Sequence, residues 1–233
     1  HCHTHYSDGS NTVEEMALAA KARGYAYIGI TDHSAAAAYA GGLGADDLLR
    51  QCDEIDAVNA HLEGIRVLKG VEADILQDGT LDYGDEVLAR LDFVIGSIHS
   101  RFTMTREEMT ARVLAAMDSP YLTILGHPTG RLLLQREAYA LDMDAVIAKA
   151  AQTGVALEIN ADPHRLDIDW RLLAKAKAAG CTISIGADAH NVAGIANAQY
   201  GVGIARKGGL GRADILNCRD VEGFVAFARR RRG

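Results

Sequence analysis

The stretch DFVIGSIH, residues 92–99, is a short apolar run that ends on a histidine. Its β-branched and aromatic residues are typical of a buried strand. The same pattern recurs in YIGITDH (27–33), LTILGH (122–127) and TISIGADAH (182–190). Segments with helical periodicity separate these runs, and such alternation predicts an α/β protein with a parallel sheet.

The order of the expected elements favours a closed barrel. An open, doubly wound sheet would collect its ligands at one switch point. Here candidate ligands follow nearly every strand, and they can converge only if the sheet closes. We therefore expect a (β/α)7 barrel with a metal centre at the C-terminal ends of its strands. The seven strand–helix units comprise the first residues, strands at 27–31, 66–73, 93–98, 122–125, 155–159 and 182–186, and helices at 12–23, 45–61, 86–90, 105–117, 143–153 and 170–179.

Length and composition indicate one soluble domain spanning residues 1–233, with 48% apolar and 24% charged residues. No apolar run approaches the roughly 20 residues that span a bilayer, so we expect no membrane contact and a cytoplasmic location. The four cysteines are far apart and are expected to be reduced. The net charge of −7 opposes nucleic-acid binding through a basic surface alone. Three bound divalent ions would, however, add about +6 within one cleft.

Three segments fall outside the strand–helix pattern. The glycine-rich residues 203–211 are expected to form a loop. The arginine run at 229–232 is expected to be a solvated end or the start of a linker, with a nucleic-acid-binding tail as the alternative. Because the chain starts inside a ligand motif, at His1, we expect a further region to precede it in the natural protein.

Residues that can bind metal follow the apolar runs. His1 and His3 are two apart, so a strand would present both imidazoles on one face. Glu72 and Asp188 are acidic residues within apolar strands, where an unpaired carboxylate would cost several kcal/mol. A metal centre explains both observations. The expected ligands are His1, His3, Asp8, His33, Glu72, His99, His127, Asp188 and His190.

Nine ligands exceed the three or four protein donors of one zinc site, so we expect two or three ions with a bridging carboxylate. Mixed imidazole and carboxylate ligands suit Zn²⁺, Mn²⁺ or Fe. Such a centre favours hydrolysis at phosphorus by a metal-bound hydroxide. We assign catalytic roles to Glu72, Asp188 and His190, and a supporting role to Asp74, which shares the strand face of Glu72.

Phosphate oxygens need cationic donors that are not metal ligands. Arg131 and Arg101 follow the histidines of two strand ends by four and two residues, although each could be an ordinary surface arginine. His5 is expected to be a rim residue that contacts substrate. Arg165 and Lys69 are weaker candidates. No GxSxG or convincing Cys/His arrangement offers another nucleophile.

The motifs HCHTHYSDG (1–9), ITDHS (30–34), GVEADI (70–75), GSIHS (96–100), GHPTGR (126–131) and GADAH (186–190) resemble, in order, those of the PHP (polymerase and histidinol phosphatase) superfamily. The stretches 3–34, LEINADPHRLDID (157–169) and ARKGGLGRADILN (205–217) are most similar to the C-terminal PHP domain of bacterial and archaeal family X DNA polymerases. This resemblance implies a distorted, TIM-like (β/α)7 barrel that holds three metals, and a preceding polymerase region.

The resemblance also implies ligand sets and an activity. One ion would be held by His1, His3, Glu72 and Asp188, a second by Glu72, His99 and His127, and a third by Asp8, His33 and His190. The implied activity is 3′-5′ exonuclease, 3′-phosphatase and abasic-site processing at DNA ends during repair, usually with Mn²⁺.

Two other functions remain open. One is a small-molecule phosphomonoesterase of the histidinol phosphatase type, which would use the same metals. The other is a non-catalytic PHP domain that stabilises an attached polymerase. Such a domain would be expected to lack several of the ligands, whereas all nine are present here. The related amidohydrolase fold also begins with HxH, but it usually places a carboxylated lysine where Glu72 stands. The presence of a glutamate at this position favours phosphoester chemistry.

Overall fold

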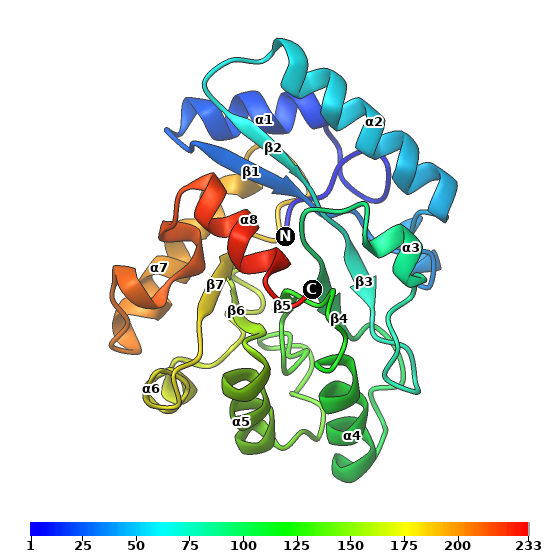
Figure 1. Ribbon diagram of the computed structural model, residues 1–233. Helices are drawn as coiled ribbons and strands as arrows, with labels where there is room; N and C mark the ends of the chain where they lie inside the picture. Colours follow the sequence, from blue (N-terminus) through cyan, green and yellow to red (C-terminus); the bar gives the residue numbers. More distant parts are fainter. Residues whose placement is uncertain (233) are drawn as a thin grey trace.

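A computed structural model describes residues 1–232 of the chain. Parallel strands lie at its centre, and the helices form an outer layer around them (Figure 1). The strands are β1 (Tyr27–Ile30), β2 (Arg66–Lys69), β3 (Glu72–Asp74), β4 (Ile95–Ser97), β5 (Ile124–Leu125), β6 (Ala156–Asn160) and β7 (Ile183–Gly186). The α-helices are α1 (Val13–Ala22), α2 (Ala45–His61), α3 (Asp85–Leu88), α4 (Arg106–Ala116), α5 (Met143–Thr153), α6 (Trp170–Ala178), α7 (Ala198–Lys207) and α8 (Val221–Arg229).

Four short 3₁₀ helices complete the structure described: η1 (Ala38–Ala40), η2 (Gly194–Asn197), η3 (Arg212–Asp214) and η4 (Leu216–Cys218). Between residues 1 and 232, no helix has both the length and the hydropathy needed to cross a bilayer.

The strands form two parallel sheets, β1-β2 and β3-β4-β5-β6-β7. Only two residues separate β2 from β3, so the two strands form one bent segment, which the sequence predicts as a single strand at 66–73. Beyond β1, His33 bridges in parallel to Glu72 at the start of β3. The two sheets are therefore continuous on this side.

The N-terminal residues join the sheets on the other side. Cys2 bridges in parallel to Ala189, just beyond β7, and the His3 amide donates to the Ala189 carbonyl at 2.8 Å. The Thr31 amide, just beyond β1, donates to the Cys2 carbonyl at 2.8 Å. Residues 1–3 thus fill the place between β7 and β1, and seven parallel segments surround one axis. The predicted (β/α)7 barrel is confirmed, and its distortion lies at this seam, where isolated bridges replace regular strand pairing.

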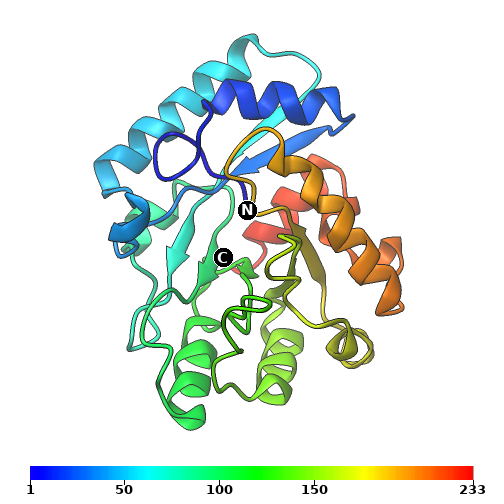
Figure 2. The ribbon, with the colours of Figure 1, turned by 180° about the vertical axis from the view of Figure 1, so that it is seen from behind.

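Apolar side chains fill two main regions. The larger core lies around β3 to β7 and includes Ile75, Met109 and Leu157, while a second lies between β1, β2 and the covering helices α1 and α2 and includes Met16 and Ile55. Seen from behind, the helices again enclose the strands, and the N-terminus lies close to the barrel axis (Figure 2).

The C-terminal part differs from the sequence expectation. Residues 203–207, predicted as loop, belong to α7, and only 208–211 continue as a connection. α8 was not predicted. Its buried residues Phe224 and Phe227 pack with Phe93 and Ile124, near the beginnings of the strands, so α8 closes the end of the barrel away from the ligands (Figure 1).

The arginine run is only partly solvated: Arg229 and Arg230 are exposed, but the last three arginines also donate to backbone carbonyls of the barrel. Arg230 donates to the carbonyl of Gly154, and Arg231 donates to those of Leu122 and Met117, at 2.9 and 2.7 Å. Arg232 donates to the Leu91 carbonyl at 2.6 Å. These carbonyls precede strands, where no helix or ladder partner satisfies them, so the guanidinium groups act as caps for the closed end of the barrel.

Candidate metal centre

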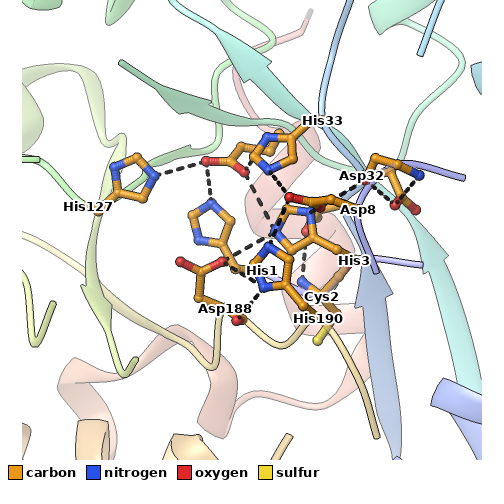
Figure 3. A network of polar contacts seen from close by, with 12 residues as sticks. His1, Cys2, His3, Asp8, Asp32, His33, His127, Asp188 and His190 are labelled. Carbon is orange, nitrogen blue, oxygen red and sulfur yellow. Dashed lines mark hydrogen bonds and ion pairs between the residues drawn. The ribbon is translucent and has the colours of Figure 1, made fainter. Parts of the chain in front are cut away.

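The predicted ligands gather at the open end of the barrel. Each lies within or just after a central segment, because parallel strands deliver the residues that follow them to the same end. Figure 3 shows the labelled imidazoles and the carboxylates of Asp8 and Asp188 gathered in one cluster. Ion-pair distances connect all nine: His1, His3, Asp8, His33, Glu72, His99, His127, Asp188 and His190.

Glu72 stands at the centre of this cluster. Its Oε1 lies 2.9 Å from His1 Nε2, 3.1 Å from His99 Nε2 and 3.0 Å from His127 Nε2. Its Oε2 lies 3.0 Å from His33 Nδ1. Burial by itself would raise the pKa of Glu72, but the surrounding histidines, His1 foremost, hold that pKa well below its usual value. Both oxygens of an ionised carboxylate are therefore presented to different imidazoles, as a bridging ligand requires.

A second group surrounds Asp8, whose oxygens lie 3.8 Å from His3 Nδ1, 3.7 Å from His33 Nε2 and 3.4 Å from His190 Nε2. Burial lowers the pKa of His190, but the hydrogen bond to Asp8 and the nearby carboxylate charges outweigh it and raise that pKa to about 9. Asp188 approaches from the other side, with Oδ1 3.3 Å from His3 Nε2. The two groups thus share His3 and His33 as neighbours.

The donor set fits divalent metal ions. Burial lowers the pKa of His33 and of His127 to about 4, so both imidazoles are neutral, the form that binds a metal. Several buried ring nitrogens make no hydrogen bond of regular geometry among residues 1–232, although two of them lie within 3.0 Å of a Glu72 oxygen. Such nitrogens are costly to bury unless another atom satisfies them. These are Nε2 of His1, both nitrogens of His3, Nδ1 of His33 and Nδ1 of His127.

Three sets of ligand atoms lie close enough to hold an ion, each set within 4.8 Å: His3, Asp8, His33 and His190; His1, Glu72 and His127; and His33, Glu72 and His99. The family resemblance implies a different division, in which His3 joins His1 and Asp188. The three sets contain eight of the nine predicted ligands and leave out Asp188. Which ligands share an ion stays a prediction.

Residues outside the predicted ligand set hold the ligands in place. Glu158 accepts a hydrogen bond from His1 Nδ1 and another from the His127 amide, at 2.8 Å. The predicted supporting residue Asp74 lies 2.5 Å from His99 Nδ1, and Asn160 donates to Asp188 Oδ2 at 2.9 Å. Glu158 could have been found from the sequence, because it is an acidic residue within the apolar stretch VALEIN (155–160).

Asp32 precedes a ligand but does not face the cluster (Figure 3). Its buried carboxylate accepts hydrogen bonds from the Thr4 amide at 2.7 Å, the Thr4 hydroxyl at 2.6 Å, the Ser7 hydroxyl at 2.6 Å and Gln51 Nε2 at 2.6 Å. It therefore fixes the turn that carries the chain from His3 to Asp8.

Two of the arginines predicted as candidates for binding phosphate lie close together in the structure. Arg131 donates to the carbonyls of Arg165 and Leu166 and, at 2.8 Å, to Asp169, and its contact with phosphate stays a prediction. Arg165, the weaker candidate, has Nε 3.3 Å from Asp188 Oδ2 and a buried Nη1 without a partner among the residues described. The loop that Arg131 holds thus places a guanidinium beside the ligands.

The remaining predicted substrate contacts lie at the rim. Arg101 is exposed in the loop after β4, and His5 is exposed with its ring 5.0 Å from that of Tyr6. Neither belongs to a metal-binding set, and their contact with substrate stays a prediction. Lys69 pairs with Asp56 at 2.6 Å and has no place in the cluster.

Sequence comparisons identify relatives of the chain. It is 45% identical over 230 residues to DNA polymerase/3′-5′ exonuclease PolX of Bacillus subtilis, a match that covers 99% of this chain and 40% of PolX. It is 30% identical over 243 residues to a probable phosphatase of Caldicellulosiruptor saccharolyticus, covering 98% of this chain and 94% of that protein.

A solved structure shares the fold. Histidinol phosphate phosphatase from Lactococcus lactis, complexed with zinc, L-histidinol and phosphate, aligns with a TM-score of 0.63 at 17% sequence identity, covering 91% of this chain and 93% of the other. In addition, the family model described as PHP domain matches residues 1–162, which contain seven of the nine predicted ligands and the whole Glu72 group. This chain therefore belongs to the PHP domain family.

Proposed function

We propose that this chain is a metal-dependent phosphoesterase that acts on DNA 3′ ends, as a 3′-5′ exonuclease and 3′-phosphatase. The observation that carries the proposal is the buried histidine and carboxylate cluster around Glu72, in a chain 45% identical to PolX over 99% of its length. The PolX relative is more than twice as long as this chain, so a covalently linked polymerase region and a role in DNA repair are part of the proposal.

The residues of the cluster would divide the work as follows. Two or three divalent ions, Mn²⁺, Zn²⁺ or Fe²⁺, would supply Lewis acidity and a water of lowered pKa for attack on phosphorus. Glu72 has Oε1 near His1, His99 and His127 and Oε2 near His33, and it would join the ions that these histidines hold. Arg165 would bind a phosphoryl oxygen with its free Nη1, while Asp188 holds its Nε.

A small-molecule phosphomonoesterase is the second candidate. Two observations favour it: this chain covers 94% of a relative called a probable phosphatase, and the solved structure with the same fold contains L-histidinol and phosphate. Both reactions would use the same ligands, so only the substrate distinguishes them. A third possibility is a domain that merely supports a polymerase and hydrolyses nothing.

The test compares substrates on protein of known metal content. We expect the Mn²⁺-supplemented protein to shorten 3′-recessed DNA and to release phosphate from a 3′-phosphorylated end, with much slower turnover of histidinol phosphate. Glu72→Gln should lose metal by elemental analysis and lose at least 100-fold in kcat/KM, whereas the exposed Glu63→Gln should retain both. The reverse substrate preference would favour the phosphomonoesterase, and a metal-loaded protein inert on all three substrates would favour the non-catalytic domain.

A further inference from the structure

The loop that follows β1 places one aromatic ring beside the metal centre. Tyr39, in η1, has its ring centroid 6.2 Å from that of His33 and 6.1 Å from that of His99. Tyr39 is 71% exposed. A large aromatic group at such a position is not explained by packing.

The loop is held in a single shape. Leu43 bridges to Ser34, and the Leu43 amide donates to the His33 carbonyl at 2.8 Å, so the two ends of the loop meet beside a metal ligand. A Cβ on Gly42 would lie 1.9 Å from the Ser34 carbonyl oxygen, so only glycine allows this approach. The Ala36 amide also donates to Asp82 Oδ2 at 2.6 Å. Tyr39 is therefore presented by an ordered loop.

The neighbours of Tyr39 leave its ring uncovered. Its flanking sequence is AAAA before it, at residues 35–38, and AGG after it, at 40–42, so no loop side chain extends beyond a methyl group. The polar groups near the ring are the imidazoles of His33 and His99 and the carboxylates behind them. An incoming substrate would therefore meet an aromatic face beside the predicted metal centre.

We propose that Tyr39 stacks on the base of the 3′-terminal nucleotide whose phosphoester lies at the metal centre; this inference rests on the proposed action at DNA 3′ ends. Every base has a π face, so aromatic stacking holds a nucleotide without regard to sequence, as an exonuclease requires. In a nucleotide, only the sugar separates the base from its 5′ phosphate. The ring of Tyr39 lies next to the imidazoles of the predicted ligands His33 and His99, so a base stacked on it would leave that phosphate near the predicted metal centre. Tyr39 would thus position the nucleotide and take no part in bond breaking.

The experiment pairs two protein changes with two DNA ends. Wild type, Tyr39→Ala and Tyr39→Phe are assayed on an oligonucleotide with a normal 3′-terminal nucleotide and on the same oligonucleotide ending in an abasic tetrahydrofuran residue. We expect Tyr39→Ala to raise KM roughly tenfold on the normal end, with little change in kcat and little change on the abasic end. Tyr39→Phe should behave as wild type, because it keeps the ring.

Controls separate stacking from other roles. Tyr200→Ala removes a tyrosine that is 47% exposed on α7, in the outer helical layer, and should leave KM unchanged. Metal content is measured for every variant. An unchanged KM in Tyr39→Ala, an equal loss on both ends, or a loss in Tyr39→Phe that points to the hydroxyl would each overturn the inference. These results presuppose cleavage by wild type; if wild type cleaves neither DNA end, the proposed function fails and the inference fails with it.

Discussion

Glu72 and Glu158 are acidic residues within apolar strands, and both are buried. One lies among five imidazoles, and the other fixes His1 and the backbone of His127. The same physical rule, that a buried carboxylate needs strong partners, applies to both residues. Glu158 satisfies this rule in the sequence as well as Glu72 does, and the structure shows the partners that Glu158 supports.

At the residue scale we predict that Glu158→Gln weakens metal binding without unfolding the protein. The carboxylate accepts a hydrogen bond from His1 Nδ1 and so directs Nε2 toward Glu72. An amide orients that imidazole less firmly, and loss of such a support typically costs about 10- to 100-fold in metal affinity. Competition with a chelator measures the effect, with the exposed Glu63→Gln as control. Equal affinities in the two variants would contradict the assigned role.

At the element scale, α8 illustrates what local patterns omit. Its residues 221–229 form an amphipathic helix. This helix follows the last expected strand and covers the closed end of the barrel, so the alternation of strands and helices does not predict it. The arginines that follow are equally dependent on context, because their partners are carbonyls of residues more than 70 positions away. A charge run gives no indication of such partners in the sequence.

We predict that Phe227→Ala lowers the free energy of unfolding by about 3 to 5 kcal/mol, the usual cost of removing a buried phenylalanine ring. Phe227 packs with Leu68 and Ile95 and lies beneath the guanidinium of Arg230. Urea denaturation measures the loss, and Val202→Ala on the exposed side of α7 should change stability by less than about 0.5 kcal/mol. Because α8 lies away from the ligands, the folded variant should bind as much metal as wild type; a reduced metal content would show that the two ends of the barrel are coupled.

At the scale of the whole molecule, the predicted metal centre brings together segments that are far apart in the sequence. The predicted ligands extend from His1 to His190, and the ring of strands is completed by isolated bridges beside Cys2. Bound ions would therefore stabilise the weakest part of the barrel, since they bind only when the distant segments are together.

Removing metal with a chelator is expected to lower Tm. An ion present at 100 to 1,000 times its Kd stabilises a folded protein by about 3 to 4 kcal/mol, which for a domain of this size corresponds to roughly 5 to 15 °C. Differential scanning fluorimetry measures the shift, and adding Mn²⁺ or Zn²⁺ back should reverse it. Glu72→Ala should show a much smaller shift in Tm. A wild-type Tm that does not change when the chelator is added would argue against metal binding by the folded state.

The sequence by itself determined the strand–helix alternation and the parallel sheet, and it predicted nine metal ligands, because each depends on residue types repeated at short range. It also indicated barrel closure, since predicted ligands from the whole chain can meet only around a ring. The tertiary structure alone decided which predicted ligands lie near one another, the position of Arg165 beside Asp188, the capping contacts of the C-terminal arginines and the exposed position of Tyr39. Each of these depends on contacts between residues far apart in the chain, for which neither periodicity nor spacing provides a signal.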